Sequence, residues 1–168
     1  MVGELTWQKR LLGLWLPLIV AVSWRSLRDV DAAAVVHVRE LARLRAIPMF
    51  APLAPPTIER LAANLIPVVA AAGAWLVREG ERGDRFYVVD EGEVEIEIDG
   101  RTVRREGPGS SFGEIALLRD VPRTASVRAV TDVRLLALER DVFLSAVTGH
   151  VRSRSVADAV VAERMGSG

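Results

Sequence analysis

The sequence contains no cysteine and only two histidines, His37 and His150, among its 168 residues. Without cysteine the chain has no disulfide, no thiolate metal site and no cysteine nucleophile, which fits a reducing cytoplasm. Two histidines so far apart give little support for a histidine metal site or a Ser-His-Asp triad. Any chemistry must therefore depend on carboxylates, arginines and backbone groups, and we expect neither a metal site nor an enzyme.

An excess of charge of one sign is also lacking. The 22 basic residues balance the 22 acidic ones, so the formal net charge is zero. This balance gives no indication of a nucleic acid or an anionic membrane surface as a partner. A chain of 168 residues is long enough for one domain with a hydrophobic core and some additional segments.

One long apolar stretch occupies residues 11–24, which read "LLGLWLPLIVAVSW". At about 14 residues it is shorter than the roughly 20 that a membrane-spanning helix needs. Three interpretations remain open. The stretch is the last part of a transmembrane helix followed by the basic "WRSLR", a signal peptide with small residues at Ala21 and Ser23, or a helix packed on a soluble domain. We therefore expect residues 1–30 to be a hydrophobic segment with possible membrane association through residues 11–24.

Two helices are predicted next. Residues 31–50 are expected to form a helical linker, with a helix that starts near Asp31, a good N-cap residue, and stops before Pro48. A second helix is expected from Thr57 until Pro67 ends it, because apolar residues recur there at helical spacing.

After Pro67 the pattern changes to short strands separated by turn residues. In "EVEIEI", residues 93–98, valine and isoleucine alternate with glutamate, which predicts a half-buried strand, and the following Asp99-Gly100 predicts a hairpin. Short, evenly spaced strands without long helices between them are typical of a sandwich or jelly roll. Helical patterns return from about Arg140. The predicted fold is α+β and mainly β: a jelly-roll barrel flanked by N-terminal and C-terminal helices.

Residues 112–129 read "FGEIALLRDVPRTASVRA" and place Glu114 and Arg123 at the two ends of a segment with an apolar centre. The two charges form either a surface ion pair or a cradle for a ligand that carries a hydroxyl and a negative charge. Gly113 allows close approach of the backbone, and N–H groups near Ile115 and Ala116 would point at an anion. Arg123 offers a planar fork for two phosphate oxygens.

Residues 51–163 resemble the cyclic-nucleotide-binding domain shared by the catabolite activator protein, the regulatory subunit of cAMP-dependent protein kinase and cyclic-nucleotide-gated channels. The phosphate-binding cassette of that family is complete, as "FGEIAL" followed by Pro122, Arg123 and Ala125. The turn "EGERGDRFYVV" and the strand "GEVEI" lie upstream at the places usual in the family. The resemblance implies a domain over residues 51–168 that binds cAMP or cGMP. It implies ligand contacts from Gly113, Glu114, Ile115, Ala116, Arg123, Thr124 and Ala125.

By analogy with the family, Glu114 accepts a hydrogen bond from the ribose 2′-hydroxyl. Without ligand, Arg123 can hold Glu114 as a partner, so the ion pair and the cradle do not exclude each other. The resemblance also implies a ligand-driven switch in which a C-terminal helix, around Val156 to Val161, closes over the base as a lid. Thr124 is compatible with either purine, so cAMP and cGMP both remain open. The alternative is a domain that keeps the fold, binds nothing and serves as a scaffold for protein–protein interaction.

The output is expected at the N-terminus. Too few residues follow the last helical pattern for a helix-turn-helix, so we expect no nucleic-acid partner. The apolar segment followed by a basic junction is similar to bacterial major-facilitator transporters that carry this domain at the C-terminus. This resemblance implies a cytoplasmic regulatory module, and whether it is membrane-associated stays open. The C-terminal helix carries Val156, Ala159 and Val160 on one side, so a homodimer through this helix is also expected.

Overall fold

The computed structural model describes residues 38–166. The chain divides into two compact units, Met1–Arg39 and Glu40–Gly168, and nearly all of the first lies outside the described residues. The predictions on residues 11–24 and on the helix start at Asp31 therefore fall outside the part that the structure describes. Within residues 38–166, no helix is long and apolar enough to cross a bilayer.

Two helical segments precede the strands. Residues 38–46 are helical, and α2 spans Pro55–Ala63. Proline at the start of α2 suits the first helical turn, where its missing N–H has no intrahelical partner. The prediction that this helix continues to Pro67 is wrong, because Ile66 is already extended and opens β1. A residue before proline is disfavoured in the helical region, which accounts for the extended Ile66, and the helix itself already ends at Ala63 with Asn64 as its C-cap.

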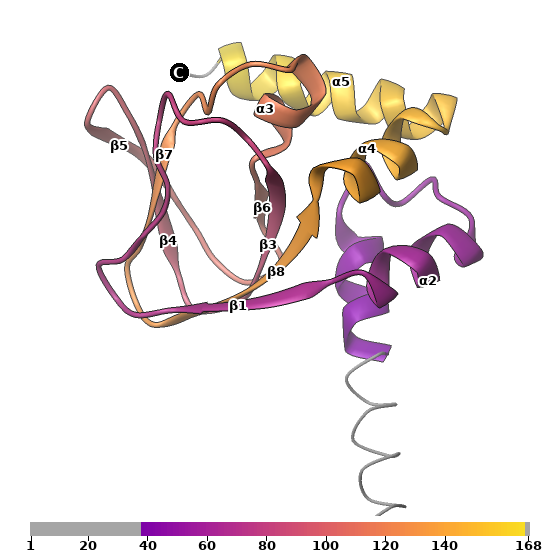
Figure 1. Cartoon of the computed structure of the whole chain (residues 1–168), viewed down its shortest axis with the longest axis horizontal. Helices are drawn as coiled ribbons and strands as arrows, with labels where there is room; N and C mark the ends of the chain where they lie inside the picture. The colour runs from indigo at the N-terminus through magenta and orange to yellow at the C-terminus, as the bar shows by residue number, and fades with distance from the viewer. Residues whose placement is uncertain (1–37, 167–168) are drawn as a thin grey trace, which may run out of the picture. The chain divides into compact units, whose positions relative to one another are not determined.

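The strands form two antiparallel four-stranded sheets (Figure 1). The order in one sheet is β1-β8-β3-β6, and in the other it is β2-β7-β4-β5. The mainly β fold with helices at both ends is confirmed, although within residues 38–166 the strands make two sheets rather than one closed barrel. The strands are β1 (Ile66–Ala70), β2 (Trp75–Val77), β3 (Arg85–Glu91), β4 (Val94–Ile98), β5 (Arg101–Glu106), β6 (Ser111–Phe112), β7 (Ser126–Ala129) and β8 (Val133–Glu139).

Strand β4 follows the predicted alternation only in part. Val94 and Ile96 are buried in a core cluster to which both sheets contribute, as expected. Glu95, however, is only 6% exposed. Its register neighbours on β7 and β5 are Arg128 and Arg105, whose side chains lie over it and form ion pairs with its carboxylate. The arginine side chains of β5 and β7 therefore cover Glu95 on the face of β4 that the alternation left outside the core.

A second core cluster joins the helices to the β1-β8-β3-β6 sheet. Its centre is three fully buried rings, Phe50, Phe86 and Phe143, with Phe86 and Phe143 stacked at 4.7 Å between ring centroids. Residues of the segment assigned to a linker take part in this cluster, among them Leu44 and Phe50. Residues 40–50 therefore pack with the domain.

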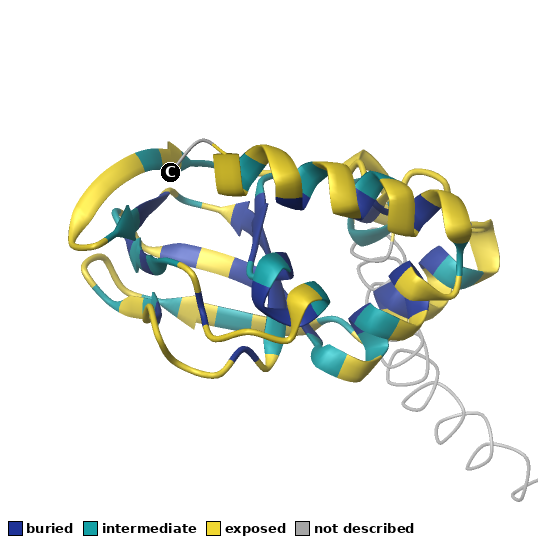
Figure 2. Ribbon diagram, turned by 90° about the horizontal axis from the view of Figure 1, so that it is seen from above, coloured by how far each residue is buried: buried dark blue, intermediate teal, exposed yellow. Residues whose placement is uncertain are grey.

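The predicted C-terminal helices are present as α4 (Arg140–Thr148) and α5 (Val151–Gly166). Figure 2 shows that one side of α5 is exposed along its length. Val156 and Val160 pack against the second core cluster, whereas Ala159 is exposed. Two of the three residues expected at a homodimer contact are thus partly buried within the chain itself, and dimerisation stays a prediction.

Candidate functional site

The short helix α3 (Glu114–Arg119) begins directly after Gly113, which follows β6. Gly113 adopts φ 94°, in the left-handed region that other residues enter only at a cost. A Cβ at this position would lie 2.6 Å from Nη1 of Arg123 and 2.9 Å from the carbonyl oxygen of Arg85. Glycine is therefore required here both by the backbone and by the close approach of Arg123.

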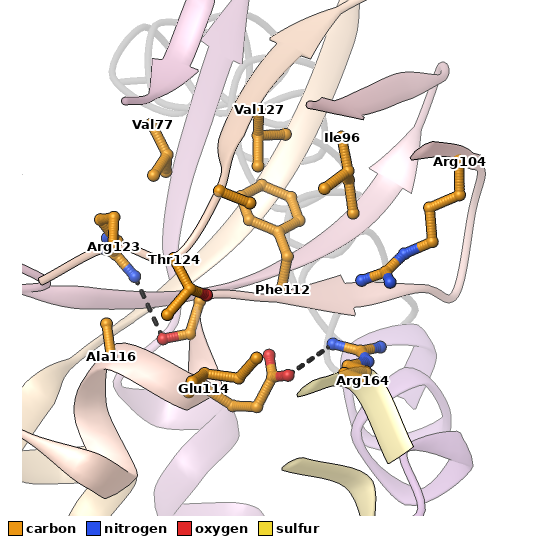
Figure 3. A pocket seen from close by; sticks show the side chains of 13 residues that line it. Val77, Ile96, Arg104, Phe112, Glu114, Ala116, Arg123, Thr124, Val127 and Arg164 are labelled. Carbon is orange, nitrogen blue, oxygen red and sulfur yellow. Dashed lines mark hydrogen bonds and ion pairs between the residues drawn. The ribbon is translucent and has the colours of Figure 1, made fainter. Parts of the chain in front are cut away.

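Backbone pairing between two loops places Arg123. The N–H of Gly80 donates to the Arg123 carbonyl at 2.8 Å, and the N–H of Arg123 donates to the Glu81 carbonyl at 2.7 Å. The guanidinium then lies inward (Figure 3), where Nη1 donates to the Gly113 carbonyl at 3.1 Å and Nη2 to the Arg85 carbonyl at 2.8 Å.

Arg123 is 5% exposed, and its charged partner in the described residues, the Asp84 carboxylate, is 3.4 Å away and itself mostly exposed. Burial lowers the pKa of Arg123 from its ordinary value, while Tyr87 and Asp84 act in the opposite direction. A guanidinium that has lost most of its water gains more from a close anion than an exposed one does. The site is therefore suited to an anionic ligand group.

Glu114 is the most deeply buried charge of the site, at 1% exposed. Its Oε1 accepts a hydrogen bond from Nη1 of Arg164 at 2.7 Å. The expectation that Arg123 holds Glu114 is wrong, because Arg123 turns toward backbone carbonyls and Arg164 reaches Glu114 from α5 instead (Figure 3). Within residues 38–166, Oε2 of Glu114 is buried and has no hydrogen-bond partner.

All seven predicted ligand contacts line one pocket of about 380 Å³, a volume that includes its open mouth. The floor is apolar and comes from four strands, β2, β4, β6 and β7. Two charged residues that the sequence did not predict, Arg104 on β5 and Arg164 on α5, complete the wall (Figure 3). The lining residues are Val77, Ile96, Arg104, Phe112, Gly113, Glu114, Ile115, Ala116, Arg123, Thr124, Ala125, Val127 and Arg164.

A helical pattern was available for Arg164. Ala157 and Val161 are fully buried on α5, and Arg164 follows at the same helical spacing, so it lies on the side that packs against the domain. No comparable pattern marks Arg104. Its strand is a run of mostly polar residues, so alternation did not distinguish its two faces.

Comparison with known proteins agrees with this geometry. Residues 67–150, half of the chain, match the family model described as cyclic nucleotide-binding domain. The chain belongs to the cyclic nucleotide-binding domain family. This cyclic nucleotide-binding domain is homologous to regulatory domains, which are not catalytic.

Among the sequence relatives, the domain is 49% identical over 74 residues to the cGMP-dependent protein kinase egl-4 of Caenorhabditis briggsae. It is 47% identical over 74 residues to the protein of the same name in Caenorhabditis elegans. In each case the match covers 44% of this chain but only 10% of the kinase. The chain thus spans about a tenth of the length of these relatives.

Similar solved structures include the regulatory domain of Toxoplasma gondii PKA with cAMP and the catabolite activator protein of Thermus thermophilus. The first has a TM-score of 0.65 and 33% sequence identity, and the match covers 67% of this chain and 45% of the Toxoplasma chain. The second has a TM-score of 0.61 and 31% identity, and covers 71% of this chain and 58% of its own. The cyclic nucleotide-binding domain therefore shares its fold with both.

Proposed function

We propose that the pocket binds a 3′,5′-cyclic nucleotide, with Arg123 at the phosphate and Glu114 at the ribose 2′-hydroxyl. The observation that carries this proposal is the buried Oε2 of Glu114, which has no hydrogen-bond partner in the described residues. A buried acceptor without a donor costs about 1–3 kcal/mol, and more when it is charged. A ribose hydroxyl satisfies such an oxygen.

The phosphate is proposed to lie between Arg123 and the start of α3. Gly113 leaves the backbone bare there, and the N–H groups of Ile115 and Ala116 belong to the first turn of the helix. Arg123 supplies the positive charge at this end of the pocket, and Thr124 and Ala125 continue the wall beyond it. This division places the two polar ends of the ligand on opposite ends of one short segment.

Arg104 supports guanine as the preferred base. Its Nε donates to Glu106 at 2.8 Å, and its guanidinium ends at the pocket wall near Arg164 (Figure 3). Guanine presents two adjacent acceptors, N7 and O6, whereas adenine places an amino donor beside N7. A donor-only guanidinium therefore fits guanine better, and the hydroxyl of Thr124 is compatible with either base.

Titration calorimetry of the full chain tests the proposal. We expect both cyclic nucleotides to bind, with cGMP about tenfold tighter, because a well-placed arginine distinguishes guanine from another base by about 1–3 kcal/mol. A thermal-shift assay with the same ligands provides an independent measurement. No heat and no shift at millimolar ligand would contradict binding and leave the scaffold alternative.

The variant Arg104→Met tests the base preference separately. It keeps the length of the side chain and removes the donors, so the affinities for cAMP and cGMP are expected to converge while both ligands still bind. Arg105→Met is the matched control, because Arg105 is the next residue on β5 and its side chain lies over Glu95, not in the pocket. An equal change of preference in both variants would remove Arg104 from base recognition.

The wider context is also a proposal. The ligand would act as a switch on α5, and the module would be the cytoplasmic regulatory part of a membrane transporter-like protein, a role supported by the apolar residues 11–24 and the basic residues after them. The ligand shifts such a switch only if it binds one state of α5 better than the other.

A homodimer that pairs two chains through α5 is proposed as well. Light scattering of the full chain measures whether the particle in solution contains one chain or two.

Fractionation of cells that express the full chain measures the membrane part of this proposal. The full chain is expected to sediment with membranes, and a chain that lacks residues 1–30 is expected to stay in the supernatant. The reason is that residues 11–24 hold the long apolar stretch that a bilayer would take up. Both chains in the supernatant would contradict it, and a mature N-terminus at Trp24 in mass spectrometry would show a cleaved signal peptide instead.

A further inference from the structure

One nitrogen of Arg164 connects the end of α5 to the pocket. Nη1 donates to Oε1 of Glu114 at 2.7 Å and to the carbonyl oxygen of Ser111 at 2.9 Å. The Glu114 side chain is 1% exposed and that of Arg164 is 20% exposed. The contact thus joins the last turn of a 16-residue helix to β6 and to the first residue of α3.

The two carboxylate oxygens of Glu114 differ in their hydrogen bonding. Arg164 holds Oε1, while Oε2 is buried without a hydrogen-bond partner in residues 38–166. A hydroxyl donor bound at Oε2 would therefore not compete with Arg164 for Oε1. Displacing Arg164 would instead leave a buried carboxylate without its cation, which is strongly unfavourable. The favoured arrangement has both donors on the carboxylate at the same time.

The phosphate end of the pocket is built differently. The polar contacts of Arg123 go to Gly113, Arg85 and Asp84, none of which lies on α5. A second ion pair, Arg119–Asp158 at 3.6 Å, ties α5 to the far end of α3, but both side chains are about half exposed. Such an exposed pair contributes little. Within the described residues, the buried polar link between α5 and the pocket is therefore Arg164 with Glu114.

We propose that Arg164 is a positioning residue for ribose recognition. It fixes the Glu114 carboxylate so that Oε2 accepts the 2′-hydroxyl, and the bound hydroxyl in turn stabilises the end of α5 against the pocket. The ribose hydroxyl, not the phosphate, is then the ligand group to which α5 responds. This inference rests on the proposed function, and the coupling between ligand and helix must be reciprocal.

The test compares cGMP with 2′-deoxy-cGMP on the full chain. In the wild-type chain, cGMP is expected to bind about thirtyfold tighter, the size of one hydrogen bond to a charged group. Hydrogen exchange should show that cGMP slows the amides of residues 158–166, whereas the deoxy ligand binds without slowing them. In Arg164→Met, the affinity ratio should fall to about threefold, because a carboxylate that Arg164 no longer holds makes a poorly aligned bond worth no more than an ordinary one, and neither ligand should slow those amides.

Two further variants make the result specific. Arg154→Met removes the same charge from an exposed position of the same helix and should behave as wild type. Arg164→Lys should restore part of the ratio, because an ammonium group can still donate to Glu114.

Three outcomes would overturn the inference. The first is an unchanged ratio in Arg164→Met that still binds cGMP. The second, which needs no variant, is equal slowing of α5 by both ligands in the wild-type chain. Each of these leaves the proposed function intact. The third is failure of the wild-type chain to bind cGMP, which contradicts the proposed function as well.

Discussion

The variant Arg123→Ala is expected to lose cyclic-nucleotide affinity by about tenfold to a hundredfold or more. Each hydrogen bond to a charged group contributes about 1.5–3 kcal/mol, and a guanidinium can make two of them to one phosphate. The side chain is 5% exposed, so water does not replace the lost contact well. Titration calorimetry with cGMP and cAMP measures the effect. The affinity of Arg123→Lys should lie between those of the wild-type chain and Arg123→Ala, because an ammonium group keeps the charge but lacks the planar fork.

Folding must be checked in the same variant, because Arg123 also donates to the carbonyl oxygens of Gly113 and Arg85. We expect a lower unfolding temperature along with the loss of affinity. Arg60→Ala is the matched control, since Arg60 is an exposed arginine on α2 away from the pocket. Wild-type affinity in a folded Arg123→Ala chain would show that Arg123 is not at the ligand.

The variant Phe143→Ala should destabilise the domain by about 3–5 kcal/mol, which is typical when a buried aromatic ring is removed. Phe143 is fully buried, stacks on Phe86 at 4.7 Å and lies edge-on to Phe50 at 6.0 Å. The three rings come from segments far apart in the sequence, so the cavity would weaken α4, β3 and the N-terminal segment together. Denaturant unfolding measures the free-energy change.

Val151→Ala is the control for this prediction. Val151 is 87% exposed at the start of α5, and its truncation should change the free energy of unfolding by no more than about 0.5 kcal/mol. Phe143→Leu should cost less than Phe143→Ala because it leaves a smaller cavity. If Phe143→Ala lowered the free energy of unfolding by less than about 1 kcal/mol, the packing of the three rings would not be a main source of stability.

The features that could be predicted from the sequence are those specified by near neighbours. Alternation and an Asp-Gly turn predicted β4 and β5 correctly, because both signals lie within a few residues. The burial of Glu95 could not be predicted in this way, since it depends on Arg128, which is brought beside it only by the pairing of β4 with β7. The end of α2 was missed because the pattern of apolar residues continued past Asn64 although the helix did not.

The same distinction applies to the site. Its predicted residues lie within one short segment from Gly113 to Ala125, and the structure places them around one pocket. Arg164 is separated from Glu114 by 50 positions and meets it only because α5 returns to the sheet. The sequence therefore placed Glu114 in the site but suggested Arg123 as its partner, where the structure has Arg164. A motif indicates which groups face a ligand, but long-range packing decides which charge balances which.

The packing of residues 40–50 has a consequence for where this module can be cut and joined. The family match begins at residue 67, yet Leu44, Ile47, Met49 and Phe50 are each no more than 1% exposed in the same body. A fusion that began at Pro67 would uncover the apolar surface that these side chains fill. The transplantable unit is therefore longer at its N-terminal side than the stretch by which its relatives are recognised, and sensor chimaeras built from it must carry the preceding helical segment.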